Sequence, residues 1–434
     1  MASAVEKYVS NAEVECATVP GLTAAPGPLD SVGIVGSGTM GGGIAMCCAE
    51  AGMRVKLLDI KQEFLDRGLA VIKKNYDRSL QRKSKSQAQV DGYLSLIQGT
   101  LDYADLKDCD IVVEAVFENM KIKQEIFTKF DKVCKPGCIL SSNTSGLNID
   151  AIASATKRPE DVIGCHFFSP ANVMRLLENI RGAKSSPRTI ATAMAFGVKI
   201  KKVTCLVGNC PGFVANRVMY QSGAFKLMQS GITPQDIDAA SEGFGFKVGP
   251  FRMQDIVGLD LMARERVRRG EAEPKKFIVD AMYAAERFGQ KNGKGYYRYG
   301  QGADPRGSTD PETAKIIESV WKETGVTPRT GLSSEKMVQE LYFPVINEGF
   351  KCLEEGIALR PLDVDVCVVF GYNWPRATGG PMYYANAVGL PTVMSTLESM
   401  KLKPAALLKE CVEKGWTLDS DGLKQRLSIV HSKL

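Results

Sequence analysis

Apolar runs alternate with amphipathic segments over the first half of the chain. The apolar runs are short and rich in Val, Ile and Leu, which is typical of strands buried on both faces of a sheet. These expected strands cover residues 31–36, 54–60, 110–116, 138–142, 162–168 and 174–180. Expected helices fill the intervals at residues 39–51, 63–85 and 120–133. Strands that alternate with helices predict an α/β domain with a mostly parallel sheet.

The pattern changes at Cys210-Pro211-Gly212, beyond which strand signals fade and helical patterns dominate. A series of short landmarks then occurs twice in the same order. The first set is Gly231-Ile232, Ile237-Asp238, Phe244-Gly245-Phe246, Gly249-Pro250-Phe251 and Gly258-Leu259, and the second is Gly356-Ile357, Val364-Asp365, Phe370-Gly371-Tyr372, Gly380-Pro381-Met382 and Gly389-Leu390. An ordered repeat of this kind indicates two copies of one helical domain.

These changes of pattern divide the chain into four segments. Residues 1–30 are expected to form an N-terminal extension that ends in a Gly/Pro-rich linker, and residues 31–209 the α/β domain. Residues 210–310 are expected to form the first helical domain, and residues 311–434 the second, which repeats the first. The predicted architecture is therefore an α/β domain followed by two repeated all-α domains.

The composition argues against several classes of function. The chain has 434 residues, a net charge of +6 and no apolar stretch of the roughly 18 residues that a membrane span requires. The charge is too diffuse to indicate nucleic-acid binding, and no RNA-binding or zinc-finger signature occurs. There are 12 cysteines without a C-x-x-C pair and only 2 histidines, so we expect reduced thiols and no metal site.

A glycine motif lies between the first expected strand and the helix that follows it. It consists of Gly36, Gly38 and Gly41, with Thr39 and Met40 at the start of the helix. The N–H groups at such a helix start bind phosphate. Asp59 ends the second strand, where a carboxylate accepts hydrogen bonds from the ribose of NAD and repels the 2′-phosphate of NADP. The motif predicts a Rossmann-like NAD site; the alternative is that Asp59 only caps the next helix.

Histidine is the usual side chain for moving protons near neutral pH, and this chain has only His166 and His431. His166 ends an apolar strand, at the edge where ligands bind to open α/β sheets. Glu178 follows beyond the turn at Ser169-Pro170 and can return beside His166. A carboxylate on one imidazole nitrogen would fix the tautomer and leave the other nitrogen to accept a proton. A purely structural role for His166 is the alternative.

Several motifs carry a resemblance to the L-3-hydroxyacyl-CoA dehydrogenase family: GIVGSGTMGGGIA, VVEAVFENMKIK, SSNTSGL, HFFSPANVMRLLE, PGFVANR and GKGYYRY. Over roughly residues 31–430 the chain resembles in particular the dehydrogenase half of the peroxisomal bifunctional branch (enoyl-CoA hydratase/3-hydroxyacyl-CoA dehydrogenase). The resemblance implies NAD-dependent oxidation of L-3-hydroxyacyl-CoA to 3-ketoacyl-CoA in fatty-acid β-oxidation or a related side-chain shortening. The hydratase half does not precede residue 31, so hydration of enoyl-CoA is not expected.

The resemblance also implies roles for individual residues. His166 matches the general base of the family and Glu178 its orienting acid, while Ser145 and Asn216 match residues that contact the substrate. The positions expected beside the cofactor are Glu118, Lys123, Ser169 and Lys291. The basic helix where the family receives the CoA moiety carries Lys73 and Arg82. For either of these two, a solvated charged face is the alternative.

Cellular location and assembly are further expectations. Ser432-Lys433-Leu434 has the form of the C-terminal address read by the peroxisomal import receptor, so a peroxisomal location is expected. Single-copy relatives pair through the helical domain, and the second copy could take the partner's place, which favours a monomer with an internal pseudo-dimer. Two other functions stay open: a dehydrogenase of the same fold acting on a hydroxy acid without CoA, and an NAD-binding structural protein without turnover.

Overall fold

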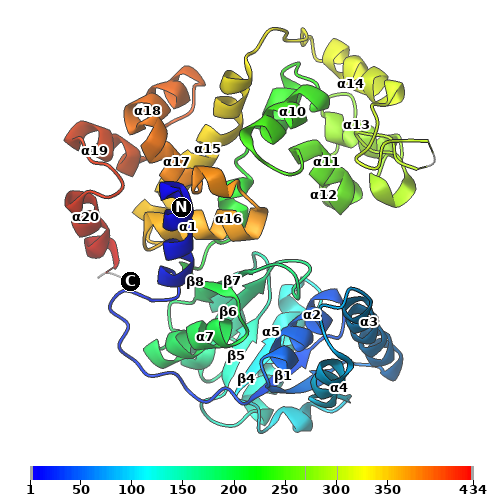
Figure 1. Ribbon diagram of the computed structural model, residues 1–434, viewed down its shortest axis with the longest axis vertical. Coiled ribbons are helices and arrows are strands. Elements are labelled where there is room, and N and C mark those ends of the chain that lie inside the picture. The colour runs from blue at the N-terminus through cyan, green and yellow to red at the C-terminus, as the bar shows by residue number, and fades with distance from the viewer. Residues whose placement is uncertain (1–2, 269, 301, 432–434) are drawn as a thin grey trace.

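The computed structural model describes residues 3–268, 270–300 and 302–431 (Figure 1). An eight-stranded sheet forms the centre of the α/β domain, in the order β3-β2-β1-β4-β5-β6-β7-β8. The strands are β1 (Ser31–Val35), β2 (Arg54–Leu58), β3 (Ile97–Thr100), β4 (Ile111–Glu114), β5 (Ile139–Ser142), β6 (Val162–Phe167), β7 (Leu176–Arg181) and β8 (Val203–Gly208). Only the β6–β7 pair is antiparallel, so the predicted mostly parallel sheet is confirmed.

Helices cover both faces of this sheet. They are α2 (Thr39–Glu50), α3 (Gln62–Gln81), α4 (Gln87–Ser95), α5 (Met120–Val133), α6 (Ile149–Ala153) and α7 (Pro187–Lys199), with 3₁₀ turns η1 (Tyr103–Leu106) and η2 (Pro159–Asp161). Alternate strand residues point to opposite faces: Val113 lies in one apolar cluster with α2 and α7, and Val112 in the other with α5 and α6. Burial on both faces explains why the strands are continuous apolar runs.

The second half of the chain is helical, as predicted. Its helices are α8 (Ala215–Met219), α9 (Ala224–Gln229), α10 (Pro234–Phe244), α11 (Pro250–Val257), α12 (Asp260–Arg268), α13 (Ile278–Ala284), α14 (Pro311–Glu323), α15 (Ser334–Glu354), α16 (Pro361–Tyr372), α17 (Pro381–Val388), α18 (Leu390–Ser399), α19 (Ala406–Lys414) and α20 (Asp421–His431), with η3 (Gln290–Asn292) and η4 (Arg376–Thr378). The long helix α15 contacts α8, α9 and α10, which joins the later helices to the earlier ones. Helix α16 packs on β7 and β8 and so reaches the α/β domain (Figure 1).

The sequence repeat corresponds to a repeated helix-capping contact. In the first copy, the buried carboxylate of Asp238 on α10 accepts from the backbone N–H groups of Phe251 and Arg252 at 2.8 and 3.0 Å, at the start of α11. In the second, Asp365 on α16 accepts from Met382 and Tyr383 at 2.6 and 3.0 Å, at the start of α17. Each aspartate satisfies N–H groups that a helix start leaves unpaired.

The N-terminal extension contains a docked helix, α1 (Ala4–Glu15), which the sequence analysis did not predict. This helix contacts α16 and η4, and the Tyr8 hydroxyl donates to Asp365 at 2.6 Å. In the first copy, the Tyr297 hydroxyl donates to Asp238 at 2.8 Å. Each buried aspartate therefore accepts from a tyrosine hydroxyl. In the first copy the tyrosine belongs to that copy, whereas in the second copy it comes from helix α1.

The remaining expectations concern the C-terminal tripeptide, membrane spans and metal sites. The tripeptide Ser432-Lys433-Leu434 lies outside the described residues. No helix among the described residues is long and apolar enough to cross a membrane. Within the same residues there is no cluster of three or more His, Cys, Asp or Glu side chains arranged to hold a metal ion.

Candidate active site

The glycine motif forms a tight turn from β1 into α2. Gly36 has φ +102°, and a Cβ there would lie 2.6 Å from the carbonyl oxygen of Ala115. A Cβ at Gly41 would lie 1.7 Å from the carbonyl oxygen of Gly36, so no larger residue fits at either position. A Cβ at Gly38 would meet nothing within 4 Å, and no side chain caps the N-terminus of α2. The open space and free N–H groups at Thr39 and Met40 fit the pyrophosphate of a dinucleotide.

Asp59, at the end of β2, is held against this turn. Its Oδ2 accepts from the backbone N–H and the hydroxyl of Ser37 at 2.8 and 2.6 Å, and its Oδ1 accepts from the N–H of Ile60 at 2.7 Å. Helix α3 begins with Lys61 as its N-cap and has no side-chain capping bond, so Asp59 does not cap that helix. A carboxylate has about four acceptor sites, so Asp59 can still accept from ribose hydroxyls. Sequence analysis did not identify Ser37 as its partner.

His166 and Glu178 form a buried pair, as predicted. The antiparallel register of β6 and β7 places these two residues opposite each other, and His166 Nδ1 lies 2.8 Å from Glu178 Oε2. A carboxylate can only accept, so Nδ1 carries the proton and Nε2 is left as a proton acceptor. The His166 residue is 5 % exposed and Glu178 0 %, so bulk water has little access to the pair. His166 therefore has a carboxylate partner at the end of the strand.

Glu178 also positions the segment that leads into the helical region. Its Oε1 accepts from the backbone N–H groups of Val214 and Ala215 at 3.1 and 2.9 Å. The chain reaches these groups through Gly212 and Phe213, whose φ angles are +77° and +52°. The Phe213 ring lies 5.6 Å from the imidazole ring of His166. One carboxylate thus fixes both the imidazole and the turn that precedes Asn216.

Ser145 and Asn216 meet beside this pair. The Asn216 amide Nδ2 lies 3.4 Å from the carbonyl oxygen of Ser145. The Ser145 hydroxyl donates to Glu118 Oε1 at 3.1 Å, and the hydroxyl of Thr144 donates to the same oxygen at 2.6 Å. Burial alone would raise the pKa of Glu118, but the Thr144 hydrogen bond and the charge of Lys123 hold that pKa below its usual value.

Lys123 is fully buried between two carboxylates. Its ammonium group lies 2.7 Å from Glu114 Oε1, at the end of β4, and 3.3 Å from Glu118 Oε2. Glu114, which sequence analysis did not single out, also accepts from the hydroxyl of Ser142 at 2.6 Å. The buried ammonium therefore holds Glu118, and through it the segment that carries Ser145, at the carboxyl ends of β4 and β5.

The remaining predicted residues lie farther from this cluster. Lys291, in η3, pairs with Asp260 at the start of α12. Lys73 lies on the exposed face of α3 and Arg82 at its C-terminal end, and neither has an ion-pair partner among the described residues. Ser169 is exposed on the turn between β6 and β7. The structure thus brings together the four residues predicted to be catalytic. The four residues described in this paragraph lie outside that cluster.

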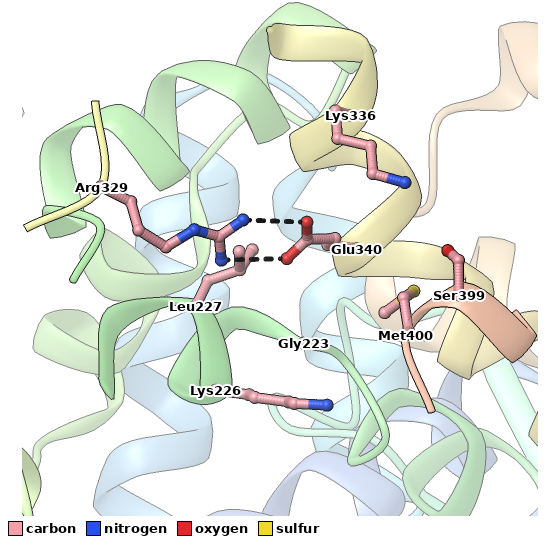
Figure 2. A pocket seen from close by; sticks show the side chains of 8 residues that line it. All are labelled: Gly223, Lys226, Leu227, Arg329, Lys336, Glu340, Ser399 and Met400. Carbon is pink, nitrogen blue, oxygen red and sulfur yellow. Dashed lines mark hydrogen bonds and ion pairs between the residues drawn. The ribbon is translucent and has the colours of Figure 1, made fainter. Parts of the chain in front are cut away.

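A separate pocket lies between α9, α15 and the end of α18 (Figure 2). It is lined by Gly223, Lys226, Leu227, Arg329, Lys336, Glu340, Ser399 and Met400. Arg329 Nη2 and Glu340 Oε1 form an ion pair at 3.1 Å across it. None of the predicted site residues lines this pocket, so it is distinct from the cluster around His166.

Comparisons with known proteins show which family the chain resembles. The sequence profile of the NAD-binding domain of 3-hydroxyacyl-CoA dehydrogenase matches residues 31–210, and the profile of its C-terminal domain matches residues 212–299. Peroxisomal bifunctional enzymes from Danio rerio and Homo sapiens are 40% and 39% identical over 90% and 91% of this chain. The chain spans 57% of the length of each of these relatives.

Solved structures give the same picture. The dehydrogenase part of multifunctional enzyme 1 from C. elegans is 30% identical, with a TM-score of 0.67 over 93% of this chain and 96% of that chain. The 3-hydroxybutyryl-CoA dehydrogenase of Escherichia coli shares the fold, with a TM-score of 0.74 over 89% of this chain and 99% of that chain, at 23% identity.

Proposed function

Because this chain belongs to the 3-hydroxyacyl-CoA dehydrogenase family, we propose that it oxidises L-3-hydroxyacyl-CoA to 3-ketoacyl-CoA with NAD. The observation that carries the proposal is the buried contact between His166 Nδ1 and Glu178, 2.8 Å apart, which leaves Nε2 as a base. The base lies at the end of β6, in the same sheet whose β1 end carries the glycine turn. A base and a dinucleotide site along one sheet edge are the parts that hydride transfer from an alcohol requires.

The protein's own residues move the proton and offset its charge. Bound NAD would supply the acceptor for the hydride that leaves the carbon carrying the hydroxyl group. His166 Nε2 takes the hydroxyl proton as that hydride leaves, and the imidazole becomes positively charged. Glu178, whose carboxylate is 0 % exposed, stabilises this charge through Nδ1–H. A base positioned in this way contributes about 10²–10⁴-fold to the rate.

Other residues orient the two ligands. The N–H groups of Thr39 and Met40 would bind the pyrophosphate, and Asp59 would accept from the adenosine ribose, which favours NAD over NADP. Ser145 and Asn216 would hold the substrate oxygen next to His166. Glu118 and Lys123 would stabilise this arrangement, because Lys123 forms an ion pair with Glu118 and Glu118 accepts a hydrogen bond from the Ser145 hydroxyl.

The more distant residues have proposed roles at the edges of the site. Lys73 and Arg82 would bind the phosphates of CoA as exposed cations on α3. Ser169 would hydrogen-bond the nicotinamide amide or ribose. Lys291, whose ammonium pairs with Asp260, would contact the cofactor from the first helical copy.

Location and assembly are part of the same proposal. The bifunctional enzymes from Danio rerio and Homo sapiens are named peroxisomal, and Ser432-Lys433-Leu434 has the form of the peroxisomal address, which supports import through the corresponding receptor. The packing of α15 on α8, α9 and α10 supports a monomer whose two helical copies pair within one chain. Size-exclusion chromatography with light scattering tests the monomer.

Turnover tests the proposed reaction directly. NADH formation is followed by absorbance with L-3-hydroxyacyl-CoAs of several chain lengths, their D enantiomers and the corresponding free 3-hydroxy acids. We expect turnover with the L thioesters alone and its loss in His166→Ala, with NAD binding nearly unchanged. Equal rates with the free acids would identify a dehydrogenase that does not use CoA. Tight NAD binding without any turnover would identify a structural protein.

A further inference from the structure

The second helical copy reaches the catalytic cluster through the last residue of α16. The Tyr372 hydroxyl lies 2.7 Å from Asn216 Oδ1. The other end of the same amide, Nδ2, lies 3.4 Å from the carbonyl oxygen of Ser145, which can only accept. The amide nitrogen must therefore face Ser145 and the amide oxygen must face Tyr372. It follows that the tyrosine donates to Asn216 Oδ1 and that its hydroxyl holds the amide in this orientation.

Tyr372 is itself held firmly. Helix α16 packs on β7, β8 and α8, and its C-cap Asn373 has a φ of +54°, the left-handed conformation common at helix C-termini. The Tyr372 ring meets the edge of Phe168 at 6.3 Å, and the Phe168 ring lies 4.4 Å from the imidazole of His166. Burial raises the pKa of Tyr372, so its hydroxyl remains a donor across the working pH range. The tyrosine thus contacts both the substrate-binding amide and the ring that packs on the base.

The sequence repeat allows Tyr372 to be compared with the matching residue of the first copy, which has no hydroxyl. The repeated landmark reads Phe370-Gly371-Tyr372 in the second copy and Phe244-Gly245-Phe246 in the first. The Phe246 ring packs instead on the rings of Tyr342 and Trp374, with centroids 5.2 and 5.5 Å away. Phe246 lies two residues beyond the last residue of α10, whereas Tyr372 is the last residue of α16 and places its hydroxyl beside Asn216 of the PGFVANR segment.

We propose that Tyr372 is a positioning residue for the dehydrogenase reaction, holding the Asn216 amide so that Nδ2 faces Ser145 and the substrate oxygen. This inference rests on the proposed function, in which Asn216 contacts the substrate. The second helical copy would then contribute to the reaction through one hydrogen bond, without touching the substrate or the cofactor itself.

Tyr372→Phe tests the hydroxyl while keeping the ring. Loss of one neutral hydrogen bond predicts a fall in kcat/KM for the acyl-CoA of about 3- to 10-fold, with KM for NAD unchanged. The double variant Asn216→Ala/Tyr372→Phe should be no slower than Asn216→Ala alone, because the tyrosine acts through the amide. The matched control is Tyr342→Phe, which removes a hydroxyl 2.7 Å from Ser241 between α10 and α15 and should leave kcat/KM unchanged.

Two results would overturn the proposal: an unchanged kcat/KM in Tyr372→Phe, or a double variant whose losses multiply. A crystal structure of Tyr372→Phe gives a readout that does not depend on turnover. We expect the Asn216 side chain to rotate away from the Ser145 carbonyl, and an amide that keeps its contact with Ser145 would also refute the role. If the unsubstituted protein turned over no acyl-CoA, the proposed function would fail while this structural comparison still decided what Tyr372 does.

Discussion

Glu178→Gln should disable the base by reversing its tautomer rather than by disturbing the fold. Glu178 Oε1 accepts from two backbone N–H groups, of Val214 and Ala215, and Oε2 contacts His166 Nδ1. A glutamine has one oxygen and one NH₂ group to offer to these two sides. If the NH₂ group faced the backbone N–H groups, two buried donors would lose their acceptor, at a cost of about 1–3 kcal/mol each.

The glutamine oxygen should therefore stay with the backbone, and its NH₂ group should face His166. The imidazole Nδ1 must then accept, so the proton moves to Nε2, the nitrogen that the reaction needs unprotonated. Losing the base forfeits its contribution of about 10²–10⁴-fold in kcat, which equals about 3–5 kcal/mol of transition-state stabilisation. Because both hydrogen bonds to the backbone survive, we expect little change in the thermal stability of the protein.

The assay is steady-state NADH formation with a saturating L-3-hydroxyacyl-CoA, together with NAD affinity by fluorescence titration. We expect kcat to fall by at least about 100-fold while the Kd for NAD stays within about 2-fold, since Glu178 lies away from the glycine turn. His166→Ala sets the floor of activity without the base. A Glu178→Gln enzyme that retained kcat within about 3-fold would show that the tautomer of His166 is not what the pair controls.

Three further predictions concern the cofactor, the contact between helical copies and pH. Asp59→Asn should weaken NAD binding by about 1–3 kcal/mol and narrow its advantage over NADP, as measured by the two Kd values. Arg217→Gln removes hydrogen bonds to Glu348 at 2.7 Å and Glu355 at 2.6 and 2.8 Å, and should lower the free energy of unfolding by roughly 1–3 kcal/mol together with kcat. Burial raises the pKa of Asp365 to about 8, above its unfolded value, so the folded state binds the proton of this carboxyl group more tightly than the unfolded state does. The proton therefore stabilises the folded state fully at low pH, and this stabilisation is lost as the pH rises through about 8. The stability difference between the unsubstituted protein and Asp365→Asn, measured by urea unfolding, should therefore fall from pH 5 to pH 8, and a difference that grows would contradict the raised pKa.

Sequence reasoning succeeded where the physical signal is local. The turn at Ser169-Pro170 predicted that Glu178 returns beside His166, and the antiparallel register makes them direct neighbours. The glycine turn was equally local, because the spacing of its residues encodes a single backbone shape. Strand β3 escaped prediction because it is an edge strand of four residues, Ile-Gln-Gly-Thr, without an apolar run. Strand β8 (Val203–Gly208) is a buried apolar run that the same rule should have found.

The contacts that were missed join residues far apart in the chain. Tyr372 and Asn216 are separated by 156 positions, and no periodicity or spacing links them. The partner of Lys291, Asp260, likewise becomes visible only once η3 and α12 are placed together. Helix α1 buries Val9 and Ala12, and its docking also joins Tyr8 to a carboxylate on α16. Such pairings follow from tertiary packing, which a single sequence records only indirectly.

The docking of α1 has a consequence for how the chain is made. Tyr8 is synthesised well before its partner Asp365, which follows 357 positions later. At a translation rate of about 5–20 residues per second, the ribosome needs roughly 20–70 s to produce α16 after α1 has formed. The α/β domain can fold within that interval, whereas α1 must wait for its partner. The second helical copy therefore completes its packing with a helix that was synthesised long before the rest of that copy.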